Sequence, residues 1–316
     1  MELGLNNQTM NSKLTNASCD EIRGELLFDE PMSKHTSWRV GGPADRYFKP
    51  ADIDDLAVFL SQQKQQNNDQ PIYWIGLGSN LLVRDAGIRG TVIVTSGLLT
   101  GLEKLEGFKV RAEAGVACPK VAKYAAKQNC VGAEFLAGIP GTIGGALAMN
   151  AGAFGGETWN NIIAVETLDK NGQRHNRTPY EYEIAYRHVE GPGNEWFIAG
   201  IFEFSEGDGE KSFAEMRGLL EQRNASQPTN QPSCGSVFRN PENDYAARLI
   251  EMAGLKGFCL GGACVSEKHA NFIVNTGTAT AAEIEALITL VEDKVFQHHG
   301  VKLIHEVHFL GEAYEH

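Results

Sequence analysis

Glycine constrains this chain more than any other residue type. It accounts for 35 of the 316 residues, and its copies crowd between residues 76 and 156. Three short apolar runs, PIYWIGLG, GTVIVTSG and FKVRAEAG, each end in glycine and predict buried strands. Two amphipathic segments predict helices: DIDDLAVFLSQQKQQN begins at an Asp, and CPKVAKYAAKQN has Pro119 in its first turn. We therefore expect short strands that alternate with single helices.

Two glycine-rich loops are candidates for holding phosphates. The first, GLGSNLL at residues 76–82, starts like a dinucleotide fingerprint, but Leu81 stands where the third glycine should be and no helix pattern follows. The second, AGIPGTIGGALAMNAGAFGG at residues 137–156, has backbone N–H groups that could form an anion-binding nest. Such glycines can equally serve tight turns and close strand packing. Two loops of this kind favour a large diphosphate ligand, a dinucleotide held on a fold that is not a Rossmann fold.

Local signals also organise the rest of the chain. In AVETLDKNGQRHN an Asn-Gly pair at residues 171–172 predicts a hairpin. In TPYEYEIAYR, Thr178 and Glu181 form a capping box around a proline, so we expect a short helix that brings Arg187 to its end. EKSFAEMRGLLEQRN predicts a longer helix, and the linker-like ASQPTNQPSCGS follows it. We place a domain boundary between about residues 206 and 232.

Beyond this boundary the pattern is again mixed. YAARLIEMAG predicts a helix, HANFIVNTG a buried strand and VKLIHEVHFLG a final strand. Thr280 and Glu283 form a second capping box, which opens a helix that we expect to end near His299.

The stretch SCGSVFRNP sets Ser236 directly after Gly235 and shortly before an Asn-Pro turn. Gly, Ser and Asn-Pro all favour turns, so a plain turn is one interpretation. The other is a serine hydroxyl held on a constrained backbone for chemistry. The stretch by itself leaves both open.

Composition and charge narrow the class of protein. The formal net charge of −12 argues against nucleic acid as a partner, because phosphate-backbone binding needs a basic face. No apolar run approaches the roughly 20 residues that span a membrane, and the N-terminal sequence lacks the basic start and apolar stretch of a secretory signal. We expect residues 1–30 to be a polar extension.

The cysteines suggest a reducing compartment. Six cysteines in 316 residues, with no C-x-x-C pair, predict free thiols in the cytoplasm. Cys259 and Cys264 could be metal ligands, but no second Cys/His pair follows at zinc spacing, so we expect no metal site.

Seven motifs in order then carry a family likeness. They are HTSWRVGGPADRYF, GLGSNLLVRDAG, GIPGTIGGALAMNAGAFG, YRHVE, SCGSVFRNP, EKHANFIVN and HEVHFLG. From about residue 31 to residue 311 the chain closely resembles the UDP-N-acetylenolpyruvoylglucosamine reductase family. The resemblance implies an α+β fold: an FAD-binding domain of the PCMH/vanillyl-alcohol-oxidase type over residues 31–206, a helix and linker over 207–231, and a smaller substrate-covering domain over 232–316.

The resemblance also implies the reaction. NADPH reduces a non-covalently bound FAD, and the flavin then reduces UDP-N-acetylglucosamine enolpyruvate to UDP-N-acetylmuramate, in peptidoglycan precursor synthesis. We expect a cytoplasmic, monomeric enzyme whose partners are these small molecules. By resemblance, the FAD diphosphate lies against the two glycine loops, at Gly76, Gly78, Ser79, Asn80 and Leu81 and at Gly138, Ile139, Pro140, Gly141, Thr142, Gly144 and Gly145.

Three residues match the catalytic positions of the family. Ser236 corresponds to the proton donor, and Arg187 and Glu306 correspond to the groups that polarise the substrate carboxylate. A guanidinium can hold a carboxylate at two points, and a protonated carboxyl can stabilise charge that develops beside it. Other interpretations are an Arg187 that complements a helix C-terminus, a turn residue at Ser236, and a Glu306 on the solvated face of its strand.

The expected substrate contacts are less specific. Only 48 residues lie between Arg187 and Ser236, so the chain resembles the shorter class of the family, which lacks an extra loop with a substrate-clamping tyrosine. The candidate substrate-binding residues, which could also be ordinary surface polar residues, are Arg239, Asn240, Lys256, Lys268, His269 and Asn271.

Two rival functions remain open. One is a different flavin oxidoreductase of the same fold, and the other is a non-catalytic flavin or sugar-nucleotide binding protein. The presence of Arg187, Ser236 and Glu306 together argues against both.

Overall fold

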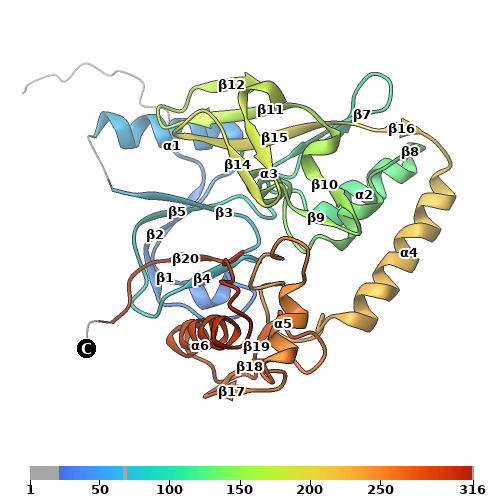
Figure 1. Ribbon diagram of the computed structural model, residues 1–316. Helices are drawn as coiled ribbons and strands as arrows, with labels where there is room; N and C mark the ends of the chain where they lie inside the picture. The colour runs from blue at the N-terminus through green and yellow to red at the C-terminus, as the bar shows by residue number, and fades with distance from the viewer. Residues whose placement is uncertain (1–20, 67–69, 315–316) are drawn as a thin grey trace, which may run out of the picture.

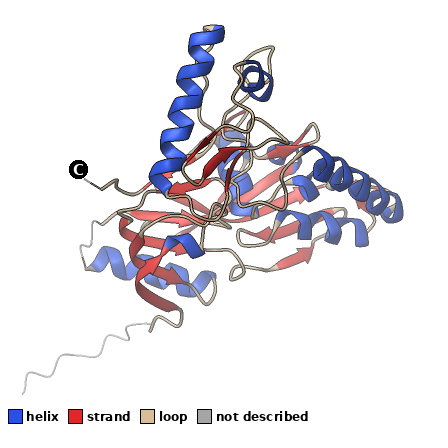
Figure 2. Ribbon diagram, turned by 90° about the horizontal axis from the view of Figure 1, so that it is seen from below, coloured by secondary structure: helices blue, strands red, loops and turns tan. Residues whose placement is uncertain are grey.

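A computed structural model describes residues 21–66 and 70–314 of the chain. Strands lie at the centre of the molecule and most helices around them (Figure 2). Two larger sheets and a C-terminal group of helices and short strands make up the fold (Figure 1).

The first sheet has four strands in the order β1-β2-β5-β3. Strand β1 is antiparallel to β2, and β2, β5 and β3 are parallel. Helix α1 (Ile53–Gln65) begins at Asp52, whose side chain accepts a hydrogen bond from the Asp55 amide, as the sequence predicts. The strands are β1 (Glu25–Pro31), β2 (Pro43–Lys49), β3 (Ile72–Ile75) and β5 (Ile88–Val94).

The second sheet has five antiparallel strands in the order β12-β11-β15-β7-β6. The predicted Asn-Gly hairpin joins β11 to β12, with Gly172 at φ +77°. Helix α1 packs between the two sheets, since Phe59 shares one apolar cluster with Phe48 of β2 and Ile198 of β15. The strands are β6 (Leu102–Lys104), β7 (Lys109–Glu113), β11 (Ile162–Asp169), β12 (Arg174–Arg177) and β15 (Glu195–Glu203).

Short elements connect and flank this sheet. The predicted helix α2 (Cys118–Lys127) has Pro119 in its first turn, and α3 (Ile143–Met149) lies within the second glycine loop. The remaining elements are η1 (Met32–Lys34), β4 (Leu81–Val83), β8 (Cys130–Val131), η2 (Glu134–Gly138), β9 (Gly152–Ala153), β10 (Gly156–Glu157), η3 (Thr158–Asn161), η4 (Pro179–Glu181), β13 (Glu183–Ala185), β14 (His188–Glu190) and β16 (Ser205–Glu206).

Helix α4 (Gly209–Ser226) runs along one side of the molecule to the C-terminal elements (Figure 1). There, α6 (Ala281–His299) begins at the predicted Thr280/Glu283 capping box. Trp38 and Leu82 belong to the same apolar cluster as α6, and β20 pairs with β4, so the C-terminal elements pack against the N-terminal part. The other elements are α5 (Ala246–Met252), β17 (Cys259–Leu260), β18 (Ala263–Val265), β19 (Ile273–Asn275) and β20 (His308–Leu310).

The structure corrects two expectations about the chain ends. Residues 1–20 of the expected polar extension lie outside the described residues, whereas residues 25–30 belong to strand β1. They join the sheet because Leu26 and Leu27 pack into apolar clusters on its two faces. The final strand is shorter than expected: residues 301–307 are irregular, and only β20 forms a ladder.

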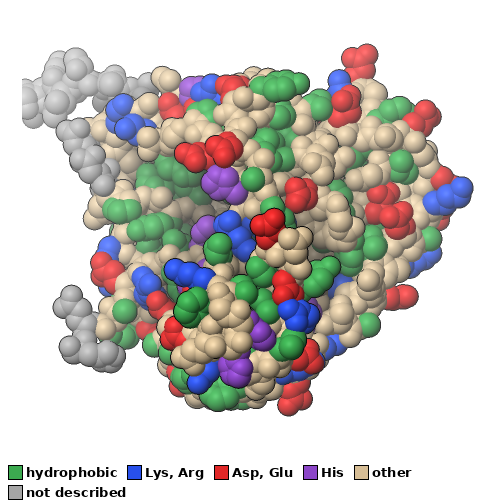
Figure 3. Space-filling model, viewed as in Figure 1, with side chains coloured by type: hydrophobic (Ala, Val, Ile, Leu, Met, Phe, Trp, Pro, Cys, Tyr) green, Lys and Arg blue, Asp and Glu red, His purple; other side chains and the backbone are tan. Residues whose placement is uncertain are grey.

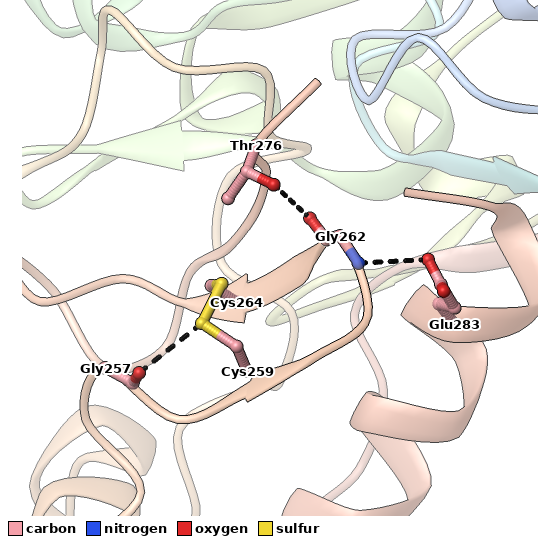
Figure 4. Close-up of a disulfide and its surroundings, with 6 residues drawn as sticks. All are labelled: Gly257, Cys259, Gly262, Cys264, Thr276 and Glu283. Carbon is pink, nitrogen blue, oxygen red and sulfur yellow. Dashed lines mark hydrogen bonds between the residues drawn. A yellow bond between two sulfur atoms is a disulfide. The ribbon is translucent and has the colours of Figure 1, made fainter. Parts of the chain in front are cut away.

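The expectation of free thiols is wrong for Cys259 and Cys264, which form a disulfide (Figure 4). The two residues are direct partners in the β17–β18 hairpin, so their side chains meet across the ladder. Cys118, Cys130 and Cys234 are free and buried, and Cys19 lies outside the described residues. Among the residues described, no group of His, Cys, Asp or Glu is placed to hold a metal ion, and none of their helices is long and apolar enough to cross a membrane.

Candidate active site

The segment that carries Ser236 lies between two other pieces of the chain. On one side Ser233 forms a β-bridge with Val274, and the Val237 amide donates to the Asn271 carbonyl. On the other side, Phe238 forms a bridge with a residue just before Glu306, and the Glu306 amide donates to the Val237 carbonyl at 2.8 Å. Ser236 and Glu306 are therefore brought next to each other, although 70 positions separate them.

Asn271 holds the part of this segment that follows Ser236. Its side chain is buried, its Nδ2 donates to the Phe238 carbonyl at 2.8 Å, and its Oδ1 accepts from the Phe238 amide at 3.0 Å. Both polar ends of the amide are thus used on the backbone two residues after Ser236. In this structure Asn271 positions the segment.

The part of the segment that precedes Ser236 is hydrogen-bonded to the first glycine loop. The Cys234 thiol donates to the Leu81 carbonyl at 3.4 Å, and burial raises the pKa of this thiol to about 12. Gly235 has φ +73°, in the left-handed region that favours glycine, so the backbone turns sharply just before Ser236. The segment that carries Ser236 is thus bonded, through Cys234, to a loop predicted to hold the cofactor.

Arg187 is not at the end of a helix. The predicted capping box forms, but its helix is the single turn η4, and β13 and β14 then pair as a hairpin with Ala185 opposite His188. Arg187 lies in the turn between them, at φ +54°. The predicted short helix is present, but the expectation that it brings Arg187 to its end is wrong, because pairing between the two short strands begins after one helical turn.

The hairpin turn places the Arg187 guanidinium against three hydrogen-bond acceptors. Its Nη1 and Nη2 donate to the carbonyls of Asn150 and Gly152 at 3.2 and 3.0 Å. Its Nε donates to Glu306 Oε1 at 3.0 Å, and the two side chains are 15% and 13% exposed. A cation this buried and oriented is suited to holding a carboxylate.

The Glu306 side chain is largely buried, with 13% of it exposed, and is not on a solvated face. Burial raises its pKa above the ordinary 4.5, and the positive charges of Arg187 and Arg239 oppose that rise. The Glu306 carbonyl accepts from Asn80 Nδ2 at 2.9 Å, which links this residue to the first glycine loop. The site therefore contains a carboxyl group whose proton is held more tightly than in water.

A cleft of about 670 Å³ reaches Gly235, the residue directly before Ser236. Ser233 and Gly235 line one part of it, and Gly76, Ser79 and Pro140 of the two glycine loops line another. Although the protein carries a net charge of −12, four cations and no carboxylate line this cleft: Lys34, Arg39, Lys49 and Arg223. The local charge suits an anionic ligand.

The two glycine loops also approach each other closely. A Cβ at Gly76 would lie 2.2 Å from Thr142 Oγ1, so only glycine fits there. Thr142 Oγ1 is buried and has no hydrogen-bond partner among the residues that the structure describes. An unpaired buried hydroxyl between two glycine loops fits a phosphate oxygen, so these residues fit the diphosphate of FAD.

The other predicted cofactor residues are placed differently. Gly144 and Gly145 line a second, smaller pocket together with Gly76. The Gly144 amide donates to Ala114, and a Cβ at Gly138 would strike Phe154, so both glycines also serve packing. The other residues of the two loops have contacts within the protein. In the first loop, Gly78 packs against the His35 carbonyl, Asn80 donates to the Glu306 carbonyl, and Leu81 of β4 pairs with His308 of β20. In the second loop, Ile139 is buried and the Gly141 carbonyl accepts a hydrogen bond from the Cys118 amide.

The predicted substrate residues separate into two groups. Arg239 lies near Glu306, and its buried Nε has no hydrogen-bond partner within the described part of the chain, which suits a residue that binds an anion. The remaining candidates have partners within the protein. Asn240 Oδ1 accepts from Ala246, Lys256 pairs with Glu251, Lys268 Nζ donates to the Asn224 carbonyl, and His269 packs edge-on against Phe272.

Sequence reasoning missed Arg39 and Arg223. They come from segments far apart in the chain, and no local pattern marks either of them as facing the cleft. Arg39 stands within one of the seven family motifs, and that position was the only available signal for it.

Comparisons with known proteins identify the family of the chain. The family model for the UDP-N-acetylenolpyruvoylglucosamine reductase C-terminal domain matches residues 227–310, and the model for an FAD binding domain matches residues 44–177. The reductase of Alkalilimnicola ehrlichii is 57% identical over 290 residues, 92% of this chain and 96% of that protein. The Legionella pneumophila reductase is 55% identical over 294 residues, 93% of this chain and 94% of that protein.

A solved structure supports the same conclusion. The crystal structure of the Thermus caldophilus reductase (MurB) has a TM-score of 0.77 and 31% sequence identity, and the match covers 92% of this chain and 99% of that one. The predicted α+β fold with an FAD-binding domain is confirmed. The chain belongs to the UDP-N-acetylenolpyruvoylglucosamine reductase family.

Proposed function

We propose that this enzyme reduces UDP-N-acetylglucosamine enolpyruvate to UDP-N-acetylmuramate in peptidoglycan precursor synthesis, with FAD as its cofactor and NADPH as the electron donor. The observation that carries the proposal is the placement of the Arg187–Glu306 pair beside the Ser236 segment. When bound, FAD supplies the hydride that the enol β-carbon accepts. The two glycine loops, with Thr142 between them, would hold its diphosphate.

Arg187 and Glu306 stabilise the charge that this addition creates. Electron density moves onto the α-carbon and the substrate carboxylate, and Arg187 holds that carboxylate as an ion pair. A second carboxylate beside Glu306 raises the pKa of Glu306 further, because two like charges disfavour each other. In this proposal Glu306 is protonated once the substrate is bound, and it shares that proton in a hydrogen bond that strengthens as charge develops.

Ser236 completes the addition. Its hydroxyl donates a proton to the α-carbon and is reprotonated from solvent. A hydroxyl is a weak acid, so its position has to be well defined, and the Gly235 turn and the Asn271 hydrogen bonds supply that definition.

We further propose a cytoplasmic monomer with the predicted division into domains. The two family-model matches, at residues 44–177 and 227–310, lie on either side of α4, which supports a boundary there.

The proposal is tested by separating the two half-reactions under anaerobic conditions. NADPH is expected to bleach the yellow protein, and the enolpyruvyl sugar nucleotide to restore its absorbance. Acid precipitation is expected to release all of the flavin as FAD. Flavin that stays with the pellet, FMN in the supernatant, or a reduced protein that the sugar nucleotide does not reoxidise would contradict the proposal.

A further inference from the structure

The Cys259–Cys264 disulfide lies at the surface of the C-terminal elements. Cys259 of β17 is exposed, and Cys264 of β18 is half-buried. Strand β17 lies at the lower edge of the molecule in Figure 1. In the same view, Figure 3 shows apolar, basic and acidic side chains mixed over this part of the surface, with no large patch of one charge. Small dissolved thiols of either charge can therefore reach Cys259.

The other cysteines in the described part of the chain are placed differently. Cys118, Cys130 and Cys234 are free and buried. Burial raises the pKa of each of these thiols, for Cys118 and Cys234 to about 12. Because the thiolate is the form that attacks a disulfide, burial makes these three thiols unreactive in the folded protein. Among the described residues, thiol chemistry is therefore confined to the Cys259–Cys264 pair.

Hydrogen bonds also close the hairpin that carries the disulfide. At its turn, the Gly262 amide donates to Glu283 of α6 at 3.1 Å, and the Gly262 carbonyl accepts from Thr276 Oγ1 at 2.9 Å (Figure 4). At its open end, the Val265 amide donates to the Phe258 carbonyl at 2.8 Å. The disulfide joins residues only five positions apart, and a cross-link over a short loop stabilises less than one over a long loop. We therefore expect the hairpin to stay folded when the disulfide is opened.

We propose that Cys259 and Cys264 form a reversible thiol–disulfide exchange site on the folded enzyme, which reacts with low-molecular-weight thiols and their disulfides. The thiolate of a small thiol attacks the exposed Cys259 sulfur, forms a mixed disulfide and releases Cys264 as a thiolate, which takes up a proton. A second small thiol attacks the small-thiol sulfur of the mixed disulfide and releases the Cys259 thiol together with the small disulfide. In sum, two small thiols lose two electrons and two protons, and the protein disulfide gains both. Oxidation by a small disulfide runs the same steps in reverse.

The exchange site is separated from the active site by strand β19. Cys264 is the ladder partner of Val274, and Val274 in turn forms a bridge with Ser233 of the segment that carries Ser236. Cys234 of that segment is buried and stays out of the exchange. We therefore expect the disulfide and dithiol forms to reduce and reoxidise the flavin at the same rates. The proposal thus stands or falls separately from the proposed function.

The test uses the full-length folded protein, equilibrated without oxygen at graded ratios of reduced to oxidised glutathione. Free thiols are alkylated with iodoacetamide, and the labelled residues are identified by peptide mass spectrometry. We expect Cys259 and Cys264 to gain the label together as the reduced fraction rises and to lose it when oxidised glutathione is added back. Cys118, Cys130 and Cys234 are expected to be labelled only in denaturant.

Two variants test the order of attack. With oxidised glutathione, Cys264→Ser is expected to accumulate a mixed disulfide on Cys259, whereas Cys259→Ser is expected to react more slowly, because Cys264 is half-buried. Equal rates in the two variants would overturn the assigned order.

Thermal unfolding separates exchange from loss of structure. The reduced protein is expected to keep a cooperative melting transition. A disulfide that reduced glutathione opens only when the protein unfolds would overturn the proposal. Thiols that stay reduced in excess oxidised glutathione, or labelling of Cys234 before the pair in the folded protein, would also overturn it.

Discussion

Arg187 Nε lies 3.0 Å from Glu306 Oε1, and the two residues are 119 positions apart in the chain. The hairpin turn that presents Arg187 and the irregular segment that presents Glu306 meet only in the folded protein. Both side chains are largely buried, so the ion pair belongs to the interior of the site. Their closeness means that neither residue can be altered without changing the surroundings of the other.

The first prediction concerns this coupling. Arg187→Ala combined with Glu306→Gln is expected to lose clearly less activity in the flavin-reoxidation half-reaction than the product of the single losses, because both groups act on one carboxylate. Arg187→Ala is also expected to weaken substrate binding, and Glu306→Gln to act mainly on turnover. A double-mutant cycle measures the coupling. Losses that multiply cleanly would show that the two residues serve separate tasks.

The second prediction concerns pH. Burial raises the pKa of Glu306 above 4.5, and the account requires its protonated form, so the reoxidation rate is expected to fall as pH rises through the folded-state pKa. Glu306→Gln should be slower but lack this descending limb. Because the pKa of Glu306 is higher in the folded than in the unfolded chain, this residue stabilises the folded protein below pH 4.5, and this stabilisation is lost as pH rises through the folded-state pKa. An unchanged descending limb in Glu306→Gln would assign it to another group.

The third prediction treats Asn271 as a positioning residue. Asn271→Ala breaks two hydrogen bonds to Phe238 and is expected to cost about 1–3 kcal/mol in free energy of unfolding and to slow reoxidation more than 10-fold. Asn275→Ala is the matched control, since it is also a buried Asn but its side chain bonds Trp38 and the 277–279 turn. It should be similarly destabilised, with reoxidation within threefold of wild type. Equal slowing in both variants would reduce Asn271 to a general stabilising role.

Local sequence signals predicted many of the helices and strands of this fold, but they could not predict contacts between segments that are far apart in the chain. The helix that starts at Thr280 and the hairpin at residues 171–172 follow from capping and turn chemistry within a few residues. Arg187 was misplaced because pairing of β13 with β14 replaced the helix that a good capping box predicts. The sequence predicts an extension over the residues of β1, because a strand of mixed burial carries little signal by itself.

The site was predictable only where motifs mark it. Ser236, Arg187 and Glu306 lie in motifs, so resemblance assigned them roles, but pattern alone allowed Glu306 a solvated face. Its burial depends on contacts with residues 237 and 80, which no alternation reveals. The cleft cations come from separate segments, and only the folded chain brings them together.

The fourth prediction concerns the charge of the cleft. Arg223 lines it, has no carboxylate partner among the described residues, and bonds only Gln227 through Nε, so its charge is available to a phosphate. Arg223→Gln is expected to raise the dissociation constant of a phosphate-bearing ligand about 10-fold or more, since hydrogen bonds to charged groups are worth about 1.5–3 kcal/mol. Titrations with FAD, NADPH and the sugar nucleotide identify which ligand. Arg217→Gln, an exposed change on the same helix, is the control, and identical affinities in the two variants would contradict the prediction.

The central claim is that Ser236 donates the proton to the substrate, and separating the half-reactions tests it most directly. In Ser236→Ala, NADPH is expected to reduce the flavin at a near-normal rate, whereas reoxidation by the enolpyruvyl sugar nucleotide should fall about 10²–10⁴-fold, the usual contribution of a positioned proton donor. Stopped-flow absorbance of the flavin follows both steps on the same protein. Equal damage to the two half-reactions, or reoxidation at the wild-type rate, would contradict the account.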